Sequence, residues 1–63
     1  MKLTVNGEAR ELAPGTTVAA LVPEGRSGIA VALDGEVVPR PAWTETELTD
    51  GQKVEILEAK AGG

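Results

Sequence analysis

The sequence contains no cysteine and no histidine, and these two absences remove most of the side chains used in catalysis and metal binding. Without cysteine there is no thiolate nucleophile and no disulfide, and without histidine there is no imidazole base. The usual zinc ligand sets, which draw on these two residue types, are missing as well. We therefore expect a protein that binds no metal and is not an enzyme by itself.

Basic residues and long apolar runs are also scarce. Six Lys and Arg residues are scattered among ten Asp and Glu residues, which gives a net charge of −4 and a pI near 4.6. Nucleic-acid binding needs clustered basic side chains, so this class of partner is not expected. The sequence shows no signal peptide and no apolar run long enough for a membrane span, which predicts a cytoplasmic protein without a membrane partner.

The length of 63 residues corresponds to one small domain. Such a chain buries only about 60% of its unfolded surface, so its core must be thin. A single sheet with one helix packed on one face is an economical solution for this size.

The first part of the chain predicts a hairpin followed by a short helix. Residues 1–5 alternate apolar and polar side chains as a half-buried strand does, and Asn6-Gly7 favours a tight hairpin turn. The returning strand, roughly residues 8–12, is less regular. Residues 18–22 predict a helix of about one and a half turns, which Pro23 ends because the residue before a proline is disfavoured in the helical region.

The second part predicts three more strands. Residues 29–33 and the short stretch 36–38 flank a second hairpin turn at Asp34-Gly35, and Pro39 confines the short strand to a sheet edge. Residues 42–50 are too polar for a core element, but Trp43 and Leu48 can anchor them to the body. The predicted buried residues are Val5, Val18, Leu21, Val31, Leu33, Val54 and Ile56.

The end of the chain combines a strand with a tail of small residues. Val54 and Ile56 alternate with Glu55 in the period of a half-buried strand, and no large apolar side chain follows Leu57. The last two residues, Gly62 and Gly63, lack a Cβ, so this end can enter a narrow channel and present its carboxylate. We expect an ordered domain over residues 1–58 and a flexible Gly-Gly tail over residues 59–63.

A hairpin, a crossing helix and a last strand beside the first are typical of the α+β class and of the β-grasp or ubiquitin-like fold, a mixed five-stranded sheet with one short helix on one face. The sequence resembles the ThiS family of thiamine-pathway sulfur carriers over nearly its whole length. The resemblance rests on Val5-Asn6-Gly7-Glu8, Thr17-Val18, Ile29-Ala30-Val31-Ala32, Gly35-Glu36-Val37-Val38-Pro39-Arg40 with Trp43, Leu48-Thr49-Asp50-Gly51, Val54-Glu55-Ile56 and Gly62-Gly63.

This resemblance implies a carrier cycle centred on Gly63. A ThiF-type adenylyltransferase, using ATP and magnesium, would convert the Gly63 carboxylate into an acyl-adenylate. Sulfur from a cysteine desulfurase or another donor would then give a thiocarboxylate, which a ThiG-type thiazole synthase would consume in thiamine biosynthesis. The carrier would bind no cofactor itself, and Gly62 and Ala61 would lie in the active sites of its partners.

The strand pattern also predicts a docking surface for these partners. If Val54 and Ile56 face the core, then Leu57 and Ala59 face away, on the same side of the sheet as Ala30 and Ala32. This arrangement predicts a shallow apolar surface centred on Leu57, with Lys60 available to an acidic rim on a partner.

Two other functions fit the same pattern. The small subunit of molybdopterin synthase, or another sulfur carrier, would use the same tail chemistry with a different acceptor, although that family is usually longer and richer in aromatic residues. A passive β-grasp interaction module would contain the terminal Gly-Gly only incidentally. Conversion of the terminal carboxylate to a thiocarboxylate distinguishes a carrier from a passive module.

Overall fold

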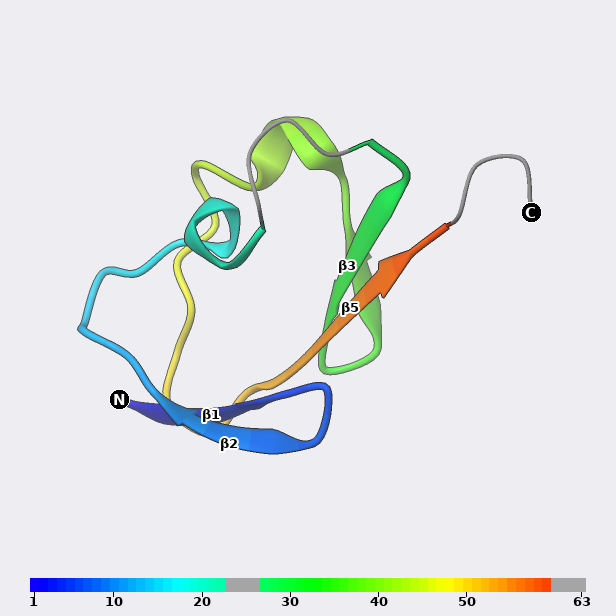
Figure 1. Ribbon diagram of the computed structural model, residues 1–63. Helices are drawn as coiled ribbons and strands as arrows, with labels where there is room; N and C mark the ends of the chain where they lie inside the picture. The colour runs from blue at the N-terminus through cyan, green and yellow to red at the C-terminus, as the bar shows by residue number, and fades with distance from the viewer. Residues whose placement is uncertain (23–26, 60–63) are drawn as a thin grey trace.

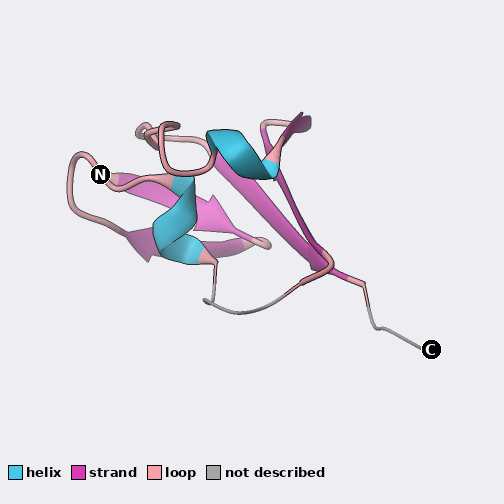
Figure 2. Ribbon diagram, turned by 90° about the horizontal axis from the view of Figure 1, so that it is seen from above, coloured by secondary structure: helices cyan, strands magenta, loops and turns pink. Residues whose placement is uncertain are grey.

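The computed structural model describes residues 1–22 and 27–59, which form a mixed sheet covered on one face by short helical turns and a connecting segment (Figures 1 and 2). The strand order is β2-β1-β5-β3-β4. The elements are β1 (Lys2–Val5), β2 (Glu8–Glu11), the 3-10 helix η1 (Val18–Leu21), β3 (Ile29–Leu33), β4 (Glu36–Val38), the 3-10 helix η2 (Arg40–Ala42) and β5 (Lys53–Glu58).

Two hairpins with matching turns form the two edges of the sheet. Asn6 and Gly7 have φ values of 51° and 81°, and Asp34 and Gly35 have values of 48° and 85°. Two consecutive positive φ values are what a two-residue turn of type I′ requires, and such turns match the twist of the flanking strands. Both predicted turns are therefore confirmed. The β1–β2 register runs without a bulge from Lys2 opposite Glu11 to Val5 opposite Glu8.

The last strand, β5, joins the two hairpins. It runs parallel to β1, with Val54 opposite Val5, and antiparallel to β3, with Val54 opposite Leu33. The turn before it is bonded to the start of β1: the Lys2 N–H donates to Asp50 Oδ1 at 2.7 Å, and the Gly51 N–H donates to the Lys2 carbonyl at 2.7 Å. These two bonds fix the point at which β5 enters the sheet beside β1.

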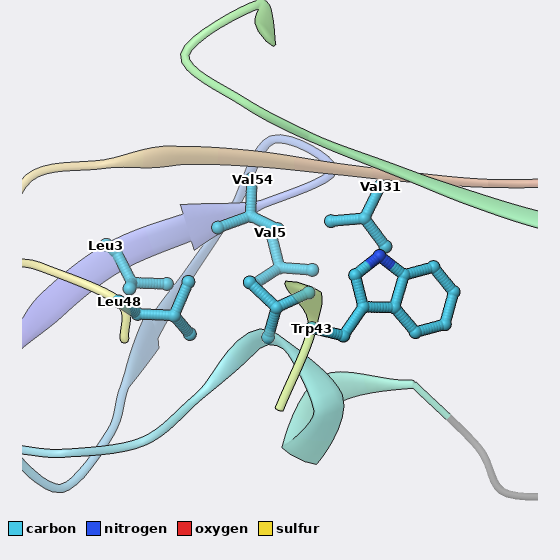
Figure 3. Close-up of a cluster of buried hydrophobic side chains, with 7 residues drawn as sticks. Leu3, Val5, Val31, Trp43, Leu48 and Val54 are labelled. Atoms are coloured by element: carbon cyan, nitrogen blue, oxygen red, sulfur yellow. The ribbon is translucent and has the colours of Figure 1, made fainter. Parts of the chain in front are cut away.

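The core lies between the sheet and the helical turns (Figure 3). It consists of Leu3, Val5, Val18, Val31, Trp43, Leu48 and Val54. Of the residues predicted to be buried, Leu21, Leu33 and Ile56 are only half-buried, although they pack against this cluster. The reason is the small cover: the helical turns on this face have only four and three residues, so side chains around the core cluster keep some exposure.

The cover is made of two single helical turns, where the sequence pattern predicts one longer helix. η1 is a 3-10 turn of four residues, and the next residue, Val22, is extended (φ −104°, ψ 128°), as expected before a proline. η2, which the sequence pattern did not predict, has a proline in its first positions, where the missing N–H costs no helical hydrogen bond. Within the described segments, no helix is long and apolar enough to cross a lipid bilayer.

The two halves of the cover are bonded to each other through the backbone. The first N–H groups of a helix have no partner within it. Here the Val18 N–H donates to the Thr46 carbonyl at 3.0 Å, and the Ala19 N–H donates to the Trp43 carbonyl at 3.1 Å. The Leu48 N–H returns a bond to the Thr16 carbonyl at 2.8 Å. The segment after η2 therefore completes η1.

Trp43 anchors this segment, as the sequence predicts. Its side chain is buried, and its indole Nε1–H donates to the Val38 carbonyl at 2.8 Å, so the one polar atom of the ring has a partner. The Arg40 guanidinium lies over the ring, 5.1 Å from its centroid. Leu48 is likewise buried, which confirms the predicted role of both residues.

Leu48 and Leu57 offer a matched test of this core. Leu48 is 3% exposed and Leu57 is 69% exposed. We expect Leu48→Ala to lower the free energy of unfolding by about 2–5 kcal/mol, because it leaves a cavity in the core. Leu57→Ala should change it by no more than about 0.5 kcal/mol. Urea denaturation followed by circular dichroism measures both; equal losses for the two variants would contradict this assignment of the core.

Candidate functional site

The candidate site lies on the uncovered face of the sheet, at the end of β5 that leads to the tail. Val54 and Ile56 face the core side, and Leu57 is exposed on the opposite side, as the alternation predicts. β5 pairs with β3 along Val54–Glu58, so its C-terminal part is held within the sheet. In Figure 1 this end of β5 points away from the β1–β2 hairpin.

Four small or apolar side chains form a surface here, which we call the tail-side platform: Leu57, Ala30, Ala32 and Val37. Leu57 lies opposite Ala30, and Ala32 lies opposite Val37. Leu57 and Val37 are 69% and 70% exposed and are the large hydrophobic residues most open to solvent in the described segments. Leu57 and Val37 lie on either side of β3, with Ala30 and Ala32 between them. Exposed apolar side chains gathered on one face often mark a binding surface.

Val37 is the platform residue that the sequence analysis missed. A two-residue hairpin turn at Asp34-Gly35 places Leu33 opposite Glu36 and hence Ala32 opposite Val37. Because residues directly opposite each other share a face, the position of Val37 beside Ala32 follows from the turn alone. The sequence therefore contained the information that places Val37 on the platform, because Val37 is the second residue after the Asp34-Gly35 turn.

Charge is concentrated at the other end of the same face. Lys53 lies opposite Thr4, and Lys2 lies opposite Glu11, all on the half of the face away from the tail. Glu55, which is half-buried and opposite Ala32, borders the tail-side platform. A partner that covers the tail end of the face therefore meets mainly apolar groups.

The side chain of Asn6 extends the contact between β1 and β5 toward the platform. Strand pairing between β1 and β5 covers Thr4 and Val5. Beyond it, Asn6 Oδ1 accepts from the Ile56 N–H at 2.8 Å, and Asn6 Nδ2 donates to the Ile56 carbonyl at 3.2 Å. The side-chain amide of Asn6 thus makes the two backbone bonds to Ile56 that a further residue of β1 would make. Ile56 directly precedes Leu57.

The described part of the site ends at Ala59, which is exposed and whose N–H donates to the Gly28 carbonyl at 2.8 Å. The predicted site residues Lys60, Ala61, Gly62 and Gly63 lie outside the described residues, as does most of the predicted flexible tail. The division of the chain between residues 58 and 59 stays a prediction.

The described residues show no buried polar cluster beside the tail-side platform. Within residues 1–22 and 27–59, no polar or charged side chain is buried, and no three acidic side chains gather where they could hold a metal ion. An open groove of about 470 Å³ lies at the Asp34-Gly35 end of the sheet, where Asp34, Glu36 and Gln52 contribute to its lining. Val37 also lines it, so the groove adjoins the β4 side of the tail-side platform.

The strand order and the two hairpins define a small β-grasp domain, and the tail-side platform includes Leu57 near the end of its last strand. The model of the ThiS family matches residues 3–63, so the chain belongs to the ThiS family. It is a sulfur carrier protein of thiamine biosynthesis, which serves as a co-substrate and is not an enzyme.

Individual relatives agree with this assignment. The chain is 30% identical over 66 residues to the sulfur carrier protein ThiS of Escherichia coli K12, and the match covers both chains completely. It is 36% identical over 66 residues to a thiazole synthase of Paramagnetospirillum magneticum, of whose length it spans 20%.

Solved structures of a relative show the same fold. The crystal structure of ThiS from Geobacter metallireducens is 36% identical, with a TM-score of 0.78 and complete coverage of both chains. The solution structure of a thiamine biosynthesis protein from the same organism gives a TM-score of 0.74 at 36% identity and covers all of this chain and 88% of that one. The predicted β-grasp fold is confirmed.

The role of Asn6 can be tested with two substitutions. Asn6→Gly keeps the positive φ of the turn but removes both bonds to Ile56, and we expect it to lower the free energy of unfolding by about 1–2 kcal/mol. Asn6→Asp retains the acceptor for the Ile56 N–H and should lose about half as much. Urea denaturation measures both values. An unchanged stability of Asn6→Gly would show that the two bonds contribute nothing.

Proposed function

We propose that the Gly63 carboxylate is the group that carries sulfur. A ThiF-type adenylyltransferase, with ATP and magnesium, joins this carboxylate to the α-phosphate of ATP and releases pyrophosphate. Sulfur at the oxidation level of sulfide, released from the persulfide of a cysteine desulfurase by a thiol reductant or supplied by another donor, then attacks the acyl carbon. It displaces AMP and leaves a thiocarboxylate on Gly63. Thiazole synthase takes up this sulfur.

The observation that carries the proposal is that Leu57, the platform residue on β5, lies on the strand that leads to Gly62-Gly63. Leu57 lies six residues before Gly63, so a partner that covers the platform has the chain end within its reach. A carboxylate is a poor electrophile until it gains a good leaving group, and the activating partner supplies that chemistry. The carrier contributes recognition and delivery.

The proposed partners differ in their support. The match to one fifth of a thiazole synthase shows that a domain like this one occurs joined to that enzyme in one protein, which supports thiazole synthase as a partner. The adenylyltransferase and the sulfur donor follow from the chemistry that a carboxylate needs to accept sulfur. Leu57, Ala30, Ala32 and Val37 form the proposed docking surface, with Ala59 and Lys60 beside it and Ala61 and Gly62 entering the partner's active site.

The attachment site is tested by changing the end of the chain. Gly63→Asp, or one residue added after Gly63, should abolish adenylation, because a displacement near one ångström at a reacting centre can cost about a hundredfold in rate. Stability should stay within about 0.5 kcal/mol. The measurement is the intact mass of each carrier after incubation with the adenylyltransferase, ATP, magnesium and a sulfur donor. The mass of the unaltered chain should rise by one oxygen-to-sulfur exchange, and the mass of either variant should stay the same.

Ala13→Asp, an exposed change of the same charge, serves as the control for the substitution. It should be converted as completely as the unaltered chain. Normal conversion of the extended chain would refute the proposal that Gly63 carries the sulfur.

The docking surface is tested by Leu57→Glu. The fold should survive, because Leu57 is exposed, but the affinity for the adenylyltransferase should fall at least about tenfold, since docking would bury a charge in an apolar contact. Ala9→Glu places the same charge on the same face at the far edge of the sheet, opposite Thr4, and should bind normally. Isothermal titration calorimetry gives both dissociation constants. Equal affinities for the two variants would remove the tail-side platform from the proposed contact surface while leaving the attachment site intact.

A further inference from the structure

Gly28 and Ala59 approach each other more closely than a side chain on Gly28 would allow without a small displacement of Ala59. The Ala59 N–H donates to the Gly28 carbonyl at 2.8 Å, one residue beyond the end of β5. A Cβ built on Gly28 would lie 3.1 Å from the Ala59 carbonyl oxygen and 3.7 Å from the Ala59 Cβ. Gly28 also has a φ of +75°, a region that residues with a side chain rarely adopt. Two separate constraints, the close contact and the positive φ, thus favour glycine at this position.

The contact between Gly28 and Ala59 lies beyond the point where the described contacts between β1 and β5 end. On the β1 side, the contacts described above reach Ile56 through the side chain of Asn6. On the β3 side, pairing runs to Glu58 opposite Ile29, and the bond between Ala59 and Gly28 continues this ladder by one step. Among the described residues, Gly28 therefore makes the last backbone bond to the chain before residues 60–63.

We infer that Gly28 is a positioning residue: it anchors Ala59 to β3 and so fixes the point from which the reactive end of the chain extends into a partner. The inference rests on the proposed function of Gly63. It assigns to Gly28 a role distinct from docking, because Gly28 lies outside the tail-side platform and contributes no side chain to any contact.

The bond between Ala59 and Gly28 limits the number of free residues that precede Gly63. Gly63 follows Ala59 by four residues, which span at most about 14 Å when extended. If the bond at Ala59 is lost, the next residue on β5 that faces β3 in the same way is Leu57, opposite Ala30, and the free length grows to six residues. The effective concentration of a tethered end falls roughly as the −3/2 power of the tether length, which predicts a decrease of about twofold from length alone.

Gly15 supplies the control for the backbone conformation. It has a φ of +89°, close to that of Gly28, but a Cβ there would have no heavy atom within 4 Å. Gly15→Ala and Gly28→Ala therefore introduce similar left-handed strain, and only Gly28→Ala disturbs Ala59. A second variant, Ala59→Pro, removes the donor of the bond and leaves Gly28 unchanged.

The experiment measures pyrophosphate release by the ThiF-type adenylyltransferase with the full chain, ATP and magnesium, as a function of carrier concentration. We expect Gly28→Ala and Ala59→Pro to lower kcat about two- to tenfold, the upper value allowing for misplacement of the end, with little change in KM. Leu57→Ala should instead raise KM, because it weakens docking. Gly15→Ala should leave both constants unchanged. A role in stability alone would not separate kcat from KM in this way.

Amide hydrogen exchange of the free carrier tests the anchor without the partner. The Ala59 amide should exchange at least about tenfold faster in Gly28→Ala than in the unaltered chain, while the Val31 amide in β3 keeps its protection. The inference is overturned if Ala59 exchanges equally fast in both proteins, or if both anchor variants keep the kcat of the unaltered chain. If the unaltered chain releases no pyrophosphate at all, the proposed function fails, and the exchange data still decide whether Gly28 holds Ala59.

Discussion

The structure depends on the backbone bonds between η1 and the segment that follows η2. A sheet of this size needs a cover over its apolar face, and the chain supplies only two single helical turns. Each turn alone would leave N–H and carbonyl groups without partners beside a hydrophobic core, which costs free energy. The bonds from Val18 and Ala19 to Thr46 and Trp43 satisfy these groups, and Val18, fully buried, lies where the two halves meet.

Because the cover lies on one side only, the two faces of the sheet carry different kinds of side chain. The covered face holds the core residues, and its contacts use the side chains of Trp43 and Leu48. The uncovered face carries Lys53 and Glu55 as well as the small side chains of Ala30 and Ala32. Its large exposed apolar groups, among the described residues, are Leu57 and Val37. A substitution on the uncovered face can therefore leave the packing of the core unchanged.

Local chemistry made much of the fold predictable. The two turns, Asn6-Gly7 and Asp34-Gly35, set the hairpins and their registers, and Trp43 and Leu48 stood out as the large apolar residues of a polar segment. The type and length of the helical cover were less predictable, because η1 is completed by residues more than twenty positions later in the chain. In the site, Leu57, Ala30 and Ala32 followed from alternation, whereas the closeness of Gly28 to Ala59 depends on the tertiary structure and leaves no periodic signal.

The central place of β5 has a consequence for the synthesis of the protein. The two hairpins touch the rest of the sheet only through β5, since the order is β2-β1-β5-β3-β4. An isolated two-stranded hairpin is at best marginally stable in water. A chain that stops before Lys53 therefore leaves two unconnected hairpins. The sheet cannot close until β5, the last strand, has been made, so incomplete chains stay unfolded and open to proteolysis.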